Sequence, residues 1–170
     1  MDDELDTLDF EKCFLAELLT MIGERLVRLE TFFDPKDPES TSDVFDPMEH
    51  LAGVGMVAAQ RYLASICKWL SVSKDDAIKW GPQKKGVAVA SIVNAVANYW
   101  KHVEDGDSAI HKPTRDILEQ IGVNLDSGYC VSNTLYECGY KHLSELMKDL
   151  LAWRDAAIEE ARVRSATEQR

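Results

Sequence analysis

The chain has 170 residues, of which 45% are hydrophobic, and a formal net charge of −11 at pH 7. This length and apolar content are typical of one globular domain with a full hydrophobic core. The sequence contains no apolar run of about 18 residues, the length that a membrane-spanning helix needs. Residues 1–10 are acidic, unlike the basic start of a secretory signal. We therefore expect a cytoplasmic protein with no membrane association.

The negative charge is concentrated in one part of the sequence. Residues 1–50 contain fifteen acidic and four basic side chains, whereas residues 51–170 contain fifteen of each. An acidic surface disfavours nucleic acid, because Lys and Arg make the contacts to phosphate. That exclusion applies only to the first segment, so RNA is kept as a candidate partner near the lysines of the later part. Between residues 78 and 103 the charged side chains are Lys79, Lys84, Lys85 and Lys101.

The first third of the chain predicts two long helices joined by a loop. Apolar residues at spacings of three and four indicate an amphipathic helix over about residues 5–33. Residues 34–46, rich in Asp, Pro and Ser, predict a mobile acidic loop. Asp46-Pro47 is a typical helix start, with an N-cap carboxylate before a proline at the first helical position. The apolar face of the second helix is expected to consist of Leu51, Val54, Ala58, Tyr62, Ile66 and Trp69.

The remaining sequence predicts two further long helices and two short ones. Their expected positions are a short helix from Ser73 to Gly81, a long one over 86–103, a short one over 113–121 and a long one over 133–162. No convincing strand pair, internal repeat or Gly-rich phosphate loop is present. Four long and two short helices predict an all-α helical bundle. This bundle would form a single domain over residues 1–164, followed by a polar tail over residues 165–170.

The four cysteines do not form a CxxC motif, so neither a disulfide nor a zinc framework is predicted. We expect the thiols to behave as small buried hydrophobic groups. Cys138 and His142 are four residues apart on one face of a predicted helix, which is a metal-ligand spacing. Two ligands do not make a zinc site, so the expectation is a buried cysteine and an exposed histidine. No cofactor is predicted.

The predicted helix over residues 86–103 has an apolar and a polar side. At about 100° per residue, Val89, Ile92, Val93, Val96, Trp100 and Val103 form the expected buried stripe. On the other side, Asn98 and His102 are expected one turn apart and facing away from the core, together with Ser91, Asn94 and Lys101. His102 would act as general acid or base if Asn98 or Asp105 fixed one ring nitrogen. Lys101 would supply positive charge to a phosphate. The alternative is a merely solvated helix face.

The stretch Ala97-Asn98-Tyr99-Trp100-Lys101-His102 resembles the motif of HEPN domains (higher eukaryotes and prokaryotes nucleotide-binding). These are small all-α bundles of toxin–antitoxin and antiviral systems, with the motif Arg-Asn-x-x-x-His on a long helix. Asn98 and His102 match, and Ala97 stands in the arginine position. The resemblance implies a homodimer in which two motifs meet. In active members it implies metal-independent ribonuclease activity, with the histidine as acid and base and the arginine on the phosphate. Lys101, one turn from Ala97, lacks the bidentate fork of arginine.

Three functions follow from the sequence. The leading hypothesis is a HEPN-like homodimer that acts by binding a partner, with catalysis lost or weak because Ala97 offers phosphate no donor. The second is a metal-independent endoribonuclease in which His102 is catalytic, Lys101 binds phosphate and Asn98 orients the histidine. The third is an adaptor or immunity-type protein that binds a protein partner through the acidic segment 34–46.

Overall fold

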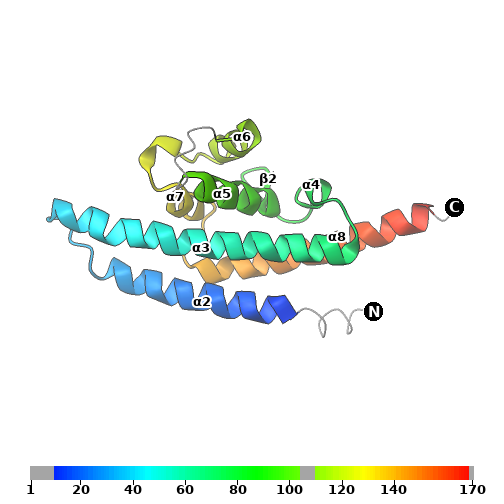
Figure 1. Ribbon diagram of the computed structural model, residues 1–170, viewed down its shortest axis with the longest axis horizontal. Coiled ribbons are helices and arrows are strands. Elements are labelled where there is room, and N and C mark those ends of the chain that lie inside the picture. Colours follow the sequence, from blue (N-terminus) through cyan, green and yellow to red (C-terminus); the bar gives the residue numbers. More distant parts are fainter. Residues whose placement is uncertain (1–9, 104–109, 169–170) are drawn as a thin grey trace.

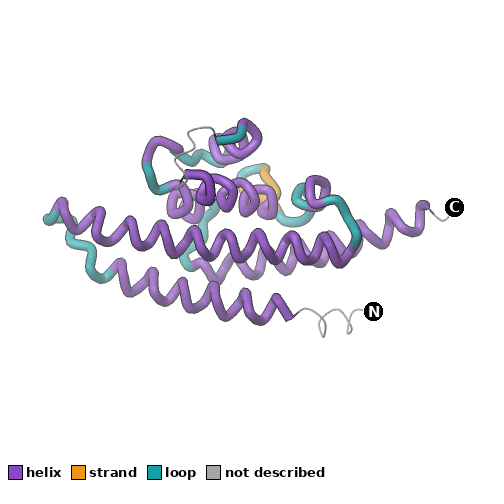
Figure 2. The backbone as a smooth tube through the Cα atoms, in the orientation of Figure 1, coloured by secondary structure: helices purple, strands orange, loops and turns teal. Residues whose placement is uncertain are grey.

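The computed structural model describes residues 10–103 and 110–168, and most of them lie in helices (Figures 1 and 2). The elements in chain order are α2 (Phe10–Glu30), α3 (Pro38–Leu70), α4 (Lys74–Ala77), β1 (Gln83–Lys84), β2 (Val87–Ala88), α5 (Val89–Val103), α6 (Lys112–Gln120), the 3₁₀ turn η1 (Leu125–Ser127), α7 (Cys130–Glu137), the 3₁₀ turn η2 (Leu143–Glu145) and α8 (Leu146–Glu168). The prediction of a mostly helical chain is confirmed.

The long helix α3 is the central element. α2 packs along one side of α3 and α5 along another, while α8 runs beside it and α6 and α7 pack on α5 (Figure 1). The interior is apolar, and its largest fully buried side chains include Leu19, Met56, Tyr62, Leu63, Leu118, Ile121, Leu150 and Trp153. In the described part of the chain, no helix has both the length and the apolar composition for crossing a bilayer.

The first predicted helix and its loop differ from the structure. α2 ends at Glu30 rather than at residue 33, and the predicted start at residue 5 lies outside the described residues. The predicted loop over residues 34–46 is wrong, because α3 begins within it and continues through Pro47. Val44 and Met48 of α3 pack with Leu29 of α2 in a small buried cluster. This packing outweighs the helical hydrogen bond that proline cannot donate.

α3 also fixes the position of α7. The carboxylate of Glu49 accepts hydrogen bonds from the backbone N–H of Val131 at 2.6 Å and of Ser132 at 2.9 Å, and from the Ser132 hydroxyl at 2.7 Å. The Tyr129 hydroxyl donates to Asp46 at 3.1 Å. Since the first N–H groups of a helix have no partner within the helix, Glu49 caps α7 from a neighbouring helix.

A two-residue hairpin precedes α5. Gln83 pairs with Ala88 and Lys84 with Val87 in an antiparallel register. Lys85 and Gly86 form the turn, with φ of 49° and 78°. Sequence reasoning missed this pair, because strands of two residues are too short to show an alternating pattern. Because Val87 and Ala88 are buried, the hairpin fixes the point at which α5 begins.

The predicted continuous helix over residues 133–162 is wrong, because the chain there forms α7, η2 and α8. Gly139 ends α7 with φ of 74°, and its N–H donates to the carbonyl of Tyr136 at 2.9 Å, as in a typical glycine helix end. Cys138 and His142 therefore do not share a helix face, although one is buried and the other exposed as expected. Residues 165–168 of the predicted tail belong to the last turn of α8.

The helix α8 holds α4 in place at two points. The indole nitrogen of the fully buried Trp153 donates to the carbonyl of Ala77 at 2.8 Å. Near the end of α8, the Arg164 guanidinium lies 4.9 Å from the ring centre of Trp80 and 3.7 Å from the Asp76 carboxylate. A buried hydrogen bond and an ion pair thus join the last helix to a four-residue helix in the middle of the chain, and a cation–π contact holds Trp80, which follows that helix.

Candidate functional site

The motif helix α5 packs closely on its neighbours. Val89, Ile92, Val93 and Val96 are buried as predicted, whereas Val103 is 46% exposed. Ala97, in the position compared with the motif arginine, is completely buried. The side chain of Trp100 covers Gly53 of α3, where an added Cβ would lie 2.1 Å from the indole nitrogen.

Five polar side chains from three helices meet beside this contact. Gln60 of α3 donates from Nε2 to Asn94 Oδ1 at 2.9 Å and to Asn98 Oδ1 at 2.8 Å. Lys101 Nζ donates to Gln60 Oε1 at 2.7 Å. Lys74 Nζ, at the start of α4, donates to Asn94 Oδ1 at 3.1 Å. We call these five residues the lysine–amide cluster.

The two lysines fix the orientation of the amides. An ammonium group can only donate, so the atom that Lys101 contacts on Gln60 must be oxygen. The Gln60 nitrogen then points to α5, where it meets the side-chain oxygens of Asn94 and Asn98. Lys74 requires the same oxygen of Asn94. All four side-chain interactions therefore agree on one arrangement.

This arrangement leaves an excess of donors. Each ammonium group uses one of its three N–H bonds within the cluster. The side-chain nitrogens of Asn94 and Asn98 make no hydrogen bond to the described part of the chain, whereas both side-chain oxygens accept at least one. The cluster therefore has positive charge and many remaining N–H groups but few remaining acceptors, and these are the properties of a site for an anion.

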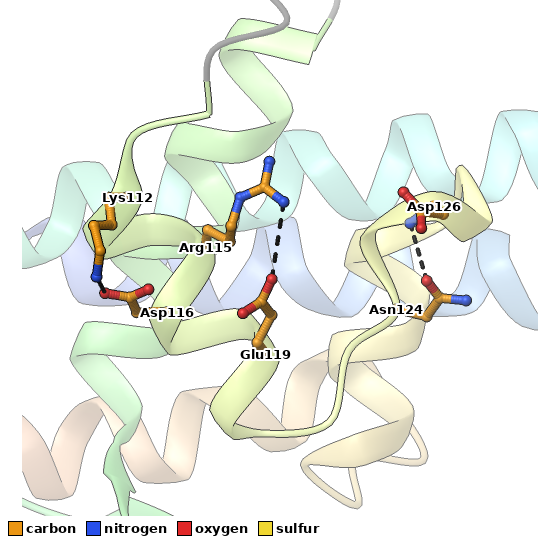
Figure 3. A network of polar contacts seen from close by, with 6 residues as sticks. All are labelled: Lys112, Arg115, Asp116, Glu119, Asn124 and Asp126. Carbon is orange, nitrogen blue, oxygen red and sulfur yellow. Dashed lines mark hydrogen bonds and ion pairs between the residues drawn. The ribbon is translucent and has the colours of Figure 1, made fainter.

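The lysines of the cluster differ from the basic residues of α6. On α6, Lys112 lies 2.7 Å from Asp116 and Arg115 lies 3.9 Å from Glu119, both pairs being exposed (Figure 3). Lys74 and Lys101 form no ion pair with any described carboxylate. Their charges are thus not neutralised within the described part of the fold.

The pKa of Lys101 is lowered from the usual value of lysine. Partial burial disfavours the charged ammonium, and the neighbouring charge of Lys74 adds a smaller repulsion. A bound anion would act in the opposite direction, because an opposite charge nearby stabilises the ammonium form.

The structure brings Asn98 and Lys101 together but does not add His102 to them. Both cluster residues bond to Gln60, whereas the His102 ring is exposed and lies edge-on to His111, with 6.4 Å between ring centres. Asn98 therefore does not fix the His102 ring through its side-chain oxygen. The alternative orienting residue, Asp105, lies outside the described residues.

The predicted polar face of α5 is wrong in part. Asn94 and Asn98 are only partly exposed and face α3, and Ser91 is buried with its hydroxyl donating to the carbonyl of Ile78 at 2.7 Å. The prediction assumes that only one side of α5 contacts the rest of the protein. α5 is instead covered by α3, α6 and α7, so part of its polar arc also meets neighbours.

Sequence reasoning missed Gln60 and Lys74. The predicted apolar face of α3 is displaced by about one residue from the buried face. Tyr62 and Ile66 are buried as predicted, whereas Val54 and Trp69 are 40% and 48% exposed. The true buried positions include Ala52, Met56, Ala59, Leu63 and Cys67. Gln60, which is 9% exposed, is a polar residue on this correct face, and that was the available signal. Lys74 had none, because only tertiary structure brings α4 to α5.

Comparison with protein-family models, curated proteins and solved structures gave no match. Within residues 10–103 and 110–168, no group of three or more His, Cys, Asp or Glu side chains is arranged to hold a metal ion. The thiols of Cys67, Cys130 and Cys138 are buried as predicted, whereas Cys13 is exposed.

Proposed function

We propose that this chain is a HEPN-like helical-bundle protein that binds the backbone of single-stranded RNA at the lysine–amide cluster and does not cleave it. The observation that carries the proposal is the excess of N–H donors around two lysines without carboxylate partners in the described fold. Lysine and side-chain amide groups are common donors to phosphate oxygens. The resemblance at Asn98 and His102 adds a toxin–antitoxin or phage-defence setting to this proposal.

Binding without cleavage is favoured by the surroundings of the motif. The buried Ala97 offers no donor to a phosphate, and the Asn98 oxygen is bonded to Gln60. A phosphate at the cluster would be held by the ammonium groups of Lys74 and Lys101 and by the amide nitrogens of the two asparagines. None of these groups is suited to accept a proton from the RNA 2′-hydroxyl.

The test is a titration of labelled single-stranded RNA by fluorescence anisotropy at several salt concentrations. Lys74→Gln and Lys101→Gln should each weaken binding by about tenfold at low salt and reduce the slope of log K against log salt by about 0.7. Lys112→Gln is the matched control, because Lys112 is exposed and paired with Asp116. Absence of binding at low salt, or equal binding by all variants, would contradict the proposal.

A metal-independent endoribonuclease is the second candidate, favoured by the neighbouring rings of His102 and His111. One imidazole could act as base and the other as acid on the RNA. The same samples decide between the two functions when they are incubated in EDTA. RNA that stays intact supports binding alone, whereas cleavage that disappears in His102→Ala would establish the ribonuclease.

A further inference from the structure

The outward face of α2 is apolar and well exposed. Phe10, Phe14 and Met21 are 77%, 68% and 62% exposed. They share one side of the helix, whereas Leu15, Leu19 and Ile22 point into the core. Phe32, just beyond the helix, is also 69% exposed. Large exposed apolar residues gathered on one side of a helix commonly mark an interaction site.

Three charged residues lie on this face between and beyond the apolar ones. At about 100° per residue, Glu17, Arg25 and Arg28 fall within a narrow arc centred on Met21. All three are exposed, and none forms an ion pair within the described part of the chain. The negative charge lies on the N-terminal side of Met21 and the positive charges on the C-terminal side.

The order of charges along this face is self-complementary for two copies of α2 that run antiparallel. If two copies of α2 cross antiparallel at Met21, Glu17 of one copy faces Arg25 of the other and Phe14 faces Arg28. Each contact then occurs twice about the twofold axis, as in an isologous interface. A parallel pairing would instead place Glu17 against Glu17 and Arg25 against Arg25, so the charges select the antiparallel arrangement.

A groove lies next to the same face. It has a volume of about 430 Å³ between α2 and α3 and is lined by Leu18, Met21, Ile22, Leu51 and Val54, with Glu24, Arg25 and Arg28 at its rim. The exposure of Val54 at 40% is explained if a side chain from a second copy enters this groove. An apolar centre with a charged rim is the usual organisation of a protein interface.

We infer that α2 is a homodimer interface, occupied by α2 of a second copy in antiparallel orientation with the twofold axis at Met21. α3 separates α2 from α5 (Figure 1). The two lysine–amide clusters therefore lie on opposite outer sides of this dimer, and the two His102 side chains do not share one cleft. The inference does not rest on RNA binding, since it uses none of the cluster residues.

Charge reversal tests the pairing on the full chain by analytical ultracentrifugation. Wild type should sediment as a dimer at micromolar concentration. Glu17→Arg or Arg25→Glu alone should weaken dimerisation by about tenfold or more, since each change turns two attractive pairs into repulsive ones. The double variant should restore the dimer. A monomeric wild type, a dimer unaffected by both single changes, or a double variant no better than the single ones would overturn the inference.

Cross-linking tests the position of the axis. In a Cys13→Ser background, Met21→Cys should form a reducible covalent dimer on mild oxidation, because residues at the axis approach within disulfide distance. Thr20→Cys in the same background is the control, as it is exposed but off the face. In wild type, the two copies of Cys13 would be about 24 Å apart along the helices and should not cross-link. Equal cross-linking by the Met21 and Thr20 variants would contradict this axis.

Discussion

Small residues determine how closely α5 approaches α3. Gly53 leaves room for the Trp100 indole, which a Cβ would meet at 2.1 Å, and Ala97 is completely buried on the α5 side. Because interiors are packed to high density, neither position has spare volume. The hydrogen bonds from Gln60 to α5 therefore depend on Gly53 and Ala97, which have no polar side-chain atoms.

Ala97→Arg, which would complete the motif of the resembling family, should destabilise the fold rather than create an enzyme. A guanidinium at this buried position would be overpacked and would lack a counter-charge, at a cost of about 3 kcal/mol or more. Chemical unfolding monitored by circular dichroism measures the loss. His102→Arg, at an exposed position of the same helix, should unfold like wild type. A stable Ala97→Arg protein that cleaves RNA would refute this expectation.

The helix α7 depends on its cap from α3. Glu49→Ala should lower the free energy of unfolding by about 2 kcal/mol, because the N–H groups of Val131 and Ser132 lose a charged acceptor. Glu49→Gln should lose less, since one side-chain oxygen remains as an acceptor. Urea titrations measure both values. Glu160→Ala, at an exposed position of α8, is the control, and a similar loss there would show that the cap has no special role.

The helices α5 and α6 could be predicted closely from the sequence, because their ends carry local turn and proline signals. The start of α3 could not, since Asp46-Pro47 is a good local start and only contacts with α2 extend the helix past it. Gly139 ends α7 inside the region predicted as one continuous helix over residues 133–162. In the site, Asn98 and Lys101 were predicted from one helix. Gln60 and Lys74 come from other helices, and a pattern along one helix cannot predict contacts between helices.

Alkaline pH should destabilise the fold as a whole. Burial raises the pKa of Cys130 to about 12 and that of Cys138 to about 11, compared with about 8.5 for an ordinary thiol. Both thiols therefore stay protonated in the folded chain while they ionise in the unfolded chain. Their stabilising contribution is complete below the ordinary pKa and is lost as pH rises through the raised values.

Urea midpoints measured from pH 8 to pH 11 check this expectation. Stability should fall above about pH 8.5 by up to about 1.4 kcal/mol per pH unit for each buried thiol. Cys138→Ala should make the decline less steep, whereas Cys13→Ser, at an exposed position, should leave it unchanged. A decline that is equally steep in all three proteins would assign it to other groups.

The contacts of α8 with α4 also affect the position of Lys74 in the lysine–amide cluster. Trp153 bonds to the last residue of α4, and Arg164 contacts Asp76 within it. Lys74 is the first residue of the same short helix and donates to Asn94. A helix near the end of the sequence thus sets the place of a lysine that contacts α5, although no residue of α8 belongs to the cluster. A chain truncated so that Arg164 is missing would keep every polar side chain of the cluster. It would nevertheless lose one of the two contacts that support Lys74 through α4.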